Sequence, residues 1–220
     1  MIVVHHLERS RSQRVLWMLE EIGLDYEVRR YARDPKTLLA PPSLKAVHPL
    51  GKSPVVVDGD QTFAESGAIL DHLAETYGAG RFAPPRGSPD GRRYAYFLHY
   101  AEGSLMPPLL LKLVFNRLPR GAPFFVRPIA QGIAAKALAV YVDPQIETHL
   151  DFLEGELRGR QWFAGEAFSA ADIQMSFPLE AAAARAGLDA RRPSLDGFLQ
   201  RIRARPAYPR ALAKGGPTIV

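Results

Sequence analysis

Cysteine is absent from the chain of 220 residues. Its absence excludes disulfide bonds, thiolate metal sites and cysteine nucleophiles, so any thiol chemistry must use a sulfur that a ligand supplies. A chain without disulfide bonds fits a reducing compartment, and we expect a cytoplasmic protein.

Long apolar runs are lacking as well. No segment approaches the roughly 18 apolar residues that indicate a membrane span. The apolar start, residues 1–4, is too short for the core of a signal peptide. We therefore expect a soluble protein that has no membrane partner.

No block of like charge marks a nucleic-acid-binding arm. Lys and Arg outnumber Asp and Glu by 28 to 23, which gives a net charge of +5. The basic residues are scattered, and the densest group is the three arginines between Arg9 and Arg14. Such a surface attracts small anions mildly. The high pI is the one feature that would favour a basic adaptor protein for nucleic acid. We therefore do not expect nucleic acid as a partner.

Metal-binding and phosphate-binding motifs are missing too. His5 and His6 occupy a predicted strand, where neighbouring side chains point to opposite faces, and the other histidines are isolated. No glycine-rich phosphate loop is present. We expect no metal ion in this protein.

The chain does contain an α/β pattern followed by an all-helical one. Residues 1–78 predict a mixed α/β domain whose first two strands are parallel, because a helix connects them. Residues 79–89, rich in glycine and proline, indicate a linker. Residues 90–220 predict helices and an irregular tail beyond Pro209. The predicted elements of the first domain are strands over 2–6, 26–31, 55–57 and 62–63, helices over 11–22 and 66–77, and a short helix within 34–48.

Ser10 lies between the first predicted strand and the first predicted helix. A hydroxyl at a helix N-terminus can stabilise an anion such as a thiolate. One charge-assisted hydrogen bond contributes about 1.5–3 kcal/mol, enough to lower a thiol pKa by a unit or more. Two alternatives remain: Ser10 is a plain helix cap, or Ser12 takes the same role.

Two further segments are candidates for ligand contact. Pro54 either simply opens a strand or follows a cis peptide, in which case the Ser53 backbone could pair with an extended peptide ligand. Ser66 suits a helix cap, but with Glu65 beside it the two could also hold the carboxylate and ammonium of an amino-acid head. Lys52 is either solvated or the partner of a second carboxylate.

The segment from Phe168 to Ile173 carries a folding signal. Ser169 and Asp172 have the spacing of a capping box, with Asp in place of the usual Glu or Gln, and the flanking apolar residues have the spacing of a hydrophobic staple. We assign Ser169 and Asp172 a structural role.

Four segments together resemble the motifs of serine-type cytosolic glutathione transferases. The chain is most similar to the Gtt-like kind of bacteria and fungi, although His48 stands where that family usually has Asn. The resemblance covers nearly the whole chain. The segments are Ser10-Arg11-Ser12-Gln13-Arg14, the entry to the third strand at residues 48–55, the helix start Glu65-Ser66-Gly67-Ala68-Ile69-Leu70, and the capping box.

The resemblance implies a thioredoxin-like domain followed by the all-helical transferase domain, assembled as a homodimer. It implies glutathione as co-substrate, with Ser10 as the catalytic donor to its sulfur and Ser12 nearby in the same site. Ser53 would pair with the cysteinyl backbone, Lys52 would meet the glycyl carboxylate, and Glu65 and Ser66 would hold the γ-glutamyl head. The hydrophobic electrophile would lie between the domains, against Tyr100, Leu105, Met106 and Leu109.

The implied reaction is attack of the glutathione thiolate on an apolar electrophile. Two alternatives share the fold: a non-catalytic binding or regulatory protein, and a glutathione-dependent peroxidase. Retention of Ser10, Glu65 and Ser66 together favours the enzyme.

Overall fold

A four-stranded sheet forms the centre of the N-terminal half in the computed structural model, which describes residues 1–188 and 191–217. The strand order is β2-β1-β3-β4, and β1 pairs parallel with β2 and antiparallel with β3. The predicted βαβ unit is confirmed, and the two strands predicted over 55–57 and 62–63 form an antiparallel hairpin around Gly59. The strands are β1 (Ile2–Leu7), β2 (Tyr26–Tyr31), β3 (Val55–Asp58) and β4 (Gln61–Ala64).

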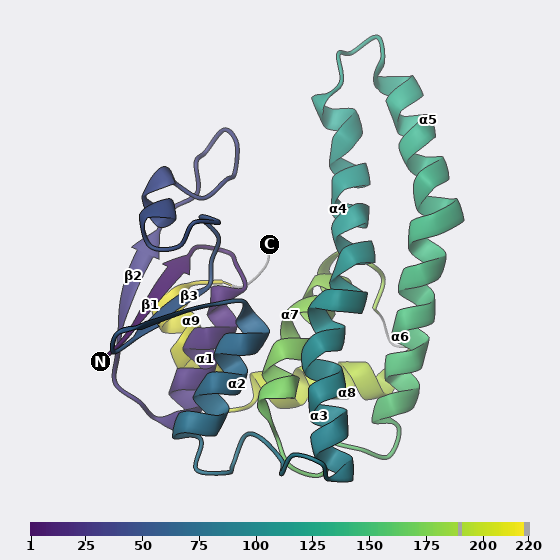
Figure 1. The fold of residues 1–220 in the computed structure, drawn as a ribbon. Helices are drawn as coiled ribbons and strands as arrows, with labels where there is room; N and C mark the ends of the chain where they lie inside the picture. Colours follow the sequence, from purple (N-terminus) through teal and green to yellow (C-terminus); the bar gives the residue numbers. More distant parts are fainter. Residues whose placement is uncertain (189–190, 218–220) are drawn as a thin grey trace.

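Helices α1 (Ser12–Ile22) and α2 (Ser66–Tyr77) lie between the sheet and the helical half of the molecule (Figure 1). The sandwiched position explains why every residue from Ser12 to Leu19 is buried, including the polar ones. The 3-10 helix η1 (Pro42–Ala46) is the short helix predicted within residues 34–48.

The helical half contains two long helical segments that each include one wider π-type turn. Except for Pro119, which lies inside α4 near its end, their prolines fall at the start or in the first turn of an α-helical stretch. Pro107 and Pro108, expected to bend or end a helix, therefore lie just inside the start of α4. The first segment is α3 (Pro89–Tyr100), η2 (Ala101–Leu105) and α4 (Met106–Gly121); the second is α5 (Arg127–Ala137), η3 (Leu138–Val142) and α6 (Asp143–Leu157).

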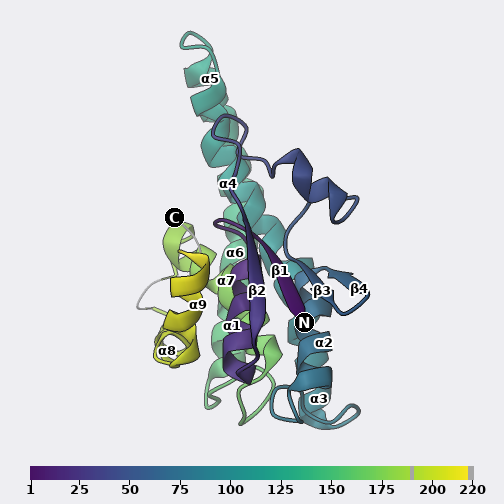
Figure 2. The same ribbon diagram turned by 90° about the vertical axis from the view of Figure 1, so that its left-hand side faces the viewer.

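Helices α4 and α5 form a hairpin that extends beyond the rest of the molecule (Figures 1 and 2). Helices α7 (Ala170–Arg185) and α8 (Pro193–Arg203) follow, and α7 packs against both α1 and α3. The domain boundaries, with a linker over 79–89, stay a prediction. Within the described residues, no helix is both long and apolar enough to cross a membrane.

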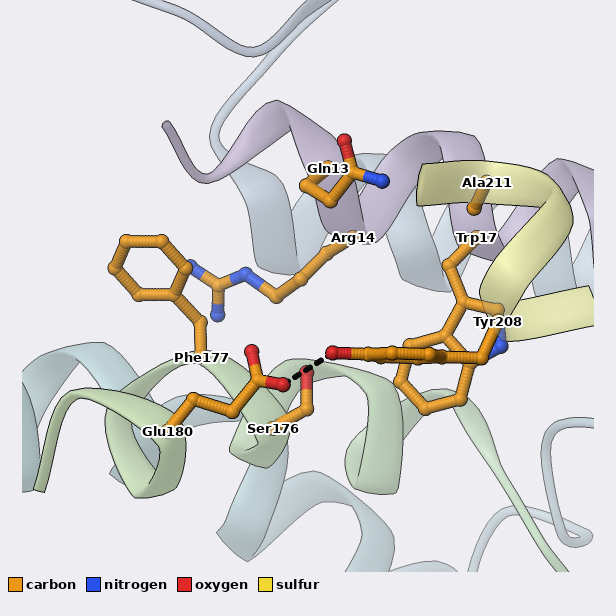
Figure 3. Close-up of a pocket in the computed structure, with 8 residues that line it drawn as sticks. All are labelled: Gln13, Arg14, Trp17, Ser176, Phe177, Glu180, Tyr208 and Ala211. Carbon is orange, nitrogen blue, oxygen red and sulfur yellow. Dashed lines mark hydrogen bonds between the residues drawn. The ribbon is translucent and has the colours of Figure 1, made fainter. Parts of the chain in front are cut away.

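The irregular tail expected beyond Pro209 was a wrong prediction. Helix α9 (Ala207–Gly215) continues through Pro209, which lies in its first turn and loses no helical hydrogen bond there. Figure 3 shows Tyr208 of α9 beside α1 and α7, with its hydroxyl directed at the Glu180 carboxylate. The Tyr208 ring meets Trp17 of α1 edge to face at 5.1 Å between centroids, so α9 completes the core around α1.

Asp172 anchors the start of α7. Its carboxylate is fully buried and accepts hydrogen bonds from the Phe163 N–H at 2.8 Å and from the Ser169 N–H and hydroxyl at 2.9 Å each. Burial raises the pKa of Asp172 to about 6, although these donors oppose the shift. The carboxylate thus fastens the preceding loop to the helix.

We expect Asp172→Ala to lower the free energy of unfolding by about 2–4 kcal/mol, because it leaves buried N–H and O–H donors without their acceptor. Urea denaturation measures the change. Asp196→Ala, at an exposed carboxylate in the first turn of α8, is the control and should cost less than about 1 kcal/mol. Equal losses in the two variants would remove Asp172 as an anchor.

Candidate active site

A polar cleft of about 300 Å³ lies where the sheet meets the helical half. It unites four of the residues predicted to contact a ligand, namely Lys52, Ser53, Glu65 and Ser66, with the structural Pro54. The other lining residues are Arg11, His48, Leu50, Ala64 and Glu102.

Ser53 connects this cleft to the end of β1. Its hydroxyl donates to the His5 carbonyl at 2.9 Å and accepts from the Leu7 N–H at 3.2 Å. The Ser53–Pro54 peptide is cis, which is the second of the two alternatives for this segment. Both hydrogen bonds of the Ser53 hydroxyl go to β1. A ligand in the cleft would therefore contact the backbone of Ser53 rather than its side chain.

Glu65 precedes α2 in an unusual backbone conformation. Its φ of 68° and ψ of 119° are sparsely populated by residues that carry a β-carbon, at a cost of about 1–3 kcal/mol. Glu65 rather than Ser66 is the N-cap, and Ser66 is the first helical residue. The Ser66 hydroxyl accepts from Gln174 Nε2 of α7 at 3.1 Å, so α7 holds the start of α2.

A chain of hydrogen bonds runs inward from Ser10. Ser10 Oγ lies 2.8 Å from Ser12 Oγ, and Ser12 Oγ lies 2.8 Å from His6 Nδ1. His6 Nε2 lies 2.8 Å from the Gly215 carbonyl oxygen of α9. All three side chains are buried.

The directions of these hydrogen bonds follow from their ends. Burial lowers the pKa of His6, which favours the neutral ring, and a carbonyl only accepts, so the proton is on Nε2. Nδ1 is then an acceptor, and Ser12 donates to it or to the Leu7 carbonyl at 3.3 Å. In either case Ser12 has no proton left for Ser10. Ser10 must therefore be the donor between the two serines.

Arg14 and Glu102 connect the two halves of the molecule at the cleft, which Glu102 lines. The Arg14 guanidinium donates to Glu102 and, at 2.7 Å, to the Gln174 carbonyl. Arg11 Nε donates to both Glu102 oxygens at 2.9 Å. Burial lowers the pKa of Arg14 to about 10, while its ion pair with Glu102 opposes the shift. Burial alone would raise the pKa of Glu102, but the two arginines hold it below its usual value.

A second cavity, of about 350 Å³, lies beside the first and shares Arg11 with it. Met106 and Leu109 line this cavity, as expected for an electrophile site. Tyr100 and Leu105 do not: Leu105 is fully buried, and the Tyr100 hydroxyl lies 2.5 Å from His149 of α6. The helix face that carries these four residues is therefore divided between the cavity and the core.

Two family models match the chain: the glutathione S-transferase N-terminal domain over residues 1–75 and the glutathione S-transferase C-terminal domain over residues 115–206. The chain belongs to the glutathione S-transferase family.

Individual relatives agree with this assignment. The chain is 40% identical to glutathione S-transferase 3 of Schizosaccharomyces pombe, over 83% of the chain and 74% of the relative. It is 34% identical to glutathione S-transferase 1 of Saccharomyces cerevisiae, over 82% and 80%. A solved glutathione S-transferase of Actinobacillus pleuropneumoniae is 34% identical, with a TM-score of 0.81 over 98% of this chain and 93% of that one. The expected fold, Gtt-like kind and transferase function are confirmed.

Several residues around the candidate site were not predicted. Arg11 stands between the two serines, and its sequence position could have indicated it. Glu102 lies some ninety positions downstream of Arg11 on a helical turn, where no local pattern marks it. His6 was considered only as a metal ligand, and among the described residues no cluster suited to a metal is present.

We expect Glu102→Gln to destabilise the transferase by about 2–3 kcal/mol, because the fully buried Arg14 loses its counter-ion. The partial exposure of Glu102 keeps the loss below that of a fully buried pair. Thermal or urea unfolding measures it. Glu27→Gln, which breaks the exposed ion pair with Arg29, is the control and should cost less than about 0.5 kcal/mol. A loss no larger than the control's would contradict the role of the pair.

Proposed function

We propose that this transferase binds glutathione in the polar cleft and that Ser10 stabilises its thiolate. The hydrogen-bond chain Ser10–Ser12–His6, with the direction inferred from its two ends, is the observation that carries the proposal. The Ser12 hydroxyl donates its proton toward His6, in the interior. The Ser10 hydroxyl donates to Ser12 and can rotate to donate to a ligand instead. The Ser12 N–H, 3.2 Å from Ser10 Oγ, stays in place as a donor to Ser10 when that proton turns.

The cleft supplies groups for both ends of the tripeptide. Glu65 would pair with the γ-glutamyl ammonium, while Ser66 and the N-terminus of α2 would receive the adjoining carboxylate. Lys52 would meet the glycyl carboxylate, and the Ser53 backbone would pair with the cysteinyl unit. All four line one cleft, which is what supports this placement. A solved sphingomonad glutathione S-transferase, 28% identical with a TM-score of 0.72, is complexed with glutathione.

The reaction then needs an electrophile beside the sulfur. Arg9 and Arg11 flank Ser10 in the chain, and both line the second cavity. A substrate held there would receive the thiolate: the sulfur–carbon bond forms, the leaving group departs with its electron pair, and the thiol proton has already passed to solvent. Stabilising the thiolate and holding both reactants together account for the rate.

The active form is proposed to be a cytoplasmic homodimer. The α4–α5 hairpin exposes apolar side chains that a second copy would cover, among them Leu118, Ile129 and Ile133, whose exposed fractions are 49%, 63% and 61%. Sedimentation equilibrium at micromolar concentration measures the mass. A monomer would refute the dimer and leave the site described above intact.

Replacing Ser10 with Ala should raise the pKa of bound glutathione toward the free thiol value of about 8.5. The loss of one charge-assisted hydrogen bond corresponds to roughly a 10- to 150-fold fall in kcat/KM. Glutathione affinity at low pH, where the thiol is protonated, should change much less. Ultraviolet absorbance of the thiolate across a pH titration measures the pKa directly.

Ser12→Ala is the companion variant for Ser10. It removes the donor to His6 and should lower stability by about 1–3 kcal/mol while shifting the thiol pKa less than Ser10→Ala does. A larger pKa shift in Ser12→Ala than in Ser10→Ala would transfer the catalytic role to Ser12.

Glu65→Ala should weaken glutathione binding at least tenfold, because it removes the partner of the γ-glutamyl ammonium. Alanine also carries a β-carbon, so the strain at this positive φ persists and the change isolates the carboxylate. Isothermal titration calorimetry measures the affinity. Glu75→Ala, at a surface glutamate on the same helix, should leave the affinity unchanged, and an equal effect in both variants would remove Glu65 from the site.

A further inference from the structure

The second cavity combines an apolar wall with an unusual number of arginines. These come from five places in the chain: the turn after β1, the start of α1, the loop after β2, α4 and α7. No acidic residue lines the cavity within the described part of the chain. The lining arginines are Arg9, Arg11, Arg33, Arg117 and Arg185, and the apolar residues are Leu38, Met106, Leu109, Leu110, Leu113, Phe177 and Ala181.

Most of this positive charge lacks a carboxylate partner. The Arg33 guanidinium donates to the carbonyl oxygens of Glu8 at 3.1 Å and Leu38 at 2.8 Å, which are neutral acceptors. Within residues 1–188 and 191–217, no carboxylate lies within 4.0 Å of the guanidinium nitrogens of Arg9, Arg33 or Arg117. Arg11 differs from these three, because it pairs with the Glu102 carboxylate at 2.9 Å.

The arginines also repel one another. Burial and then the nearby charge of Arg117 lower the pKa of Arg185. Burial lowers the pKa of Arg33 as well; Arg11 adds to the shift, and Glu8 opposes it. A bound anion would relieve this repulsion, whereas an uncharged ligand would leave it in place.

The apolar residues supply the other half of a recognition site. Met106 and Leu109 of α4 are buried except for 8% and 6% of their surfaces, and Phe177 of α7 lines the same cavity. Because Arg11 lines both cavities, a ligand body on this wall lies next to the glutathione cleft.

We propose that the electrophile of this transferase is an anionic amphiphile: an apolar aromatic or alkyl body that rests on the Met106–Leu109 wall and carries a carboxylate bound by the arginines around it. This inference rests on the proposed glutathione site, since it names the substrate class of the same reaction.

Two matched electrophiles test the proposal: 4-chloro-3-nitrobenzoate and its uncharged counterpart, 4-chloro-3-nitrobenzamide. In both, the thiolate forms a sulfur–carbon bond and chloride leaves with the electrons of the broken carbon–chlorine bond. The kcat/KM of each is divided by its uncatalysed rate constant with glutathione, which corrects for ring reactivity. We expect the benzoate to be accelerated at least tenfold more than the benzamide, and the preference to fall as ionic strength rises.

Binding of the two thioether products, measured by calorimetry, does not require turnover. The carboxylate product should bind at least tenfold more tightly than the amide product. Arg117→Gln should reduce this ratio at least threefold. Arg120→Gln, which removes an exposed arginine of α4 that lines neither cavity, is the matched control and should leave the ratio unchanged.

The two readouts separate failure of the inference from failure of the proposed function. Equal affinities for the two products, or a ratio that Arg117→Gln and Arg120→Gln change alike, overturn the anionic substrate class even if both electrophiles are conjugated. A carboxylate preference in binding that Arg117→Gln reduces, without conjugation of either electrophile, supports anion binding in the second cavity but overturns its assignment as the electrophile site, together with the proposed catalysis.

Discussion

The hydrogen bond between the His6 ring and the Gly215 carbonyl sets the chemistry of the site. It places the ring proton on Nε2 and thereby makes Nδ1 an acceptor. Ser12 donates its hydroxyl proton to this side of the site and has none left for a ligand. Ser10 is therefore the hydroxyl that can donate outward. A contact between the first strand and the last helix thus decides which of two neighbouring serines can act on a ligand.

The same contact depends on how closely α9 approaches α1. A β-carbon at Gly215 would lie 2.0 Å from Gln13 Oε1 and 2.6 Å from Leu16 Cδ1, so a larger residue there would displace these side chains of α1. Tyr208 holds the other end of α9 against Trp17 and Glu180. The ion pair of buried Arg14 with Glu102 then fixes α1 against the helical half beside the polar cleft, which Glu102 lines. Catalytic geometry and folding therefore share the same contacts.

The sequence predicted what local patterns encode. The βαβ unit, the two short strands before residue 64 and the helix over 66–77 followed from apolar periodicity and turn residues, and the structure has them. Helix α9 was missed because Pro209 was taken to end helical structure, whereas a proline in a first turn is tolerated. Four of the predicted ligand-contact residues share one cleft: Lys52, Ser53, Glu65 and Ser66. They do so because the first two precede β3 and the last two follow β4, and the start of β3 pairs with the end of β4.

The remaining features of the site come from contacts that no local pattern can show. Glu102 reaches Arg11 and Arg14 across the interface between the two halves, and Gly215 reaches His6 over more than two hundred positions. Tyr100 and Leu105 share a helix with Met106 and Leu109, but only packing decides which of them face a cavity. The arginines of the second cavity are likewise scattered along the chain and gather only after folding.

The most direct test of the central claim is a neutron structure of the glutathione complex, which shows the hydrogen positions. The account predicts deuterium on His6 Nε2, the Ser12 hydroxyl directed away from the ligand, and the Ser10 hydroxyl directed at the glutathione sulfur. Deuterium on His6 Nδ1, with Ser12 donating toward Ser10 or with the sulfur held by another group, would contradict it.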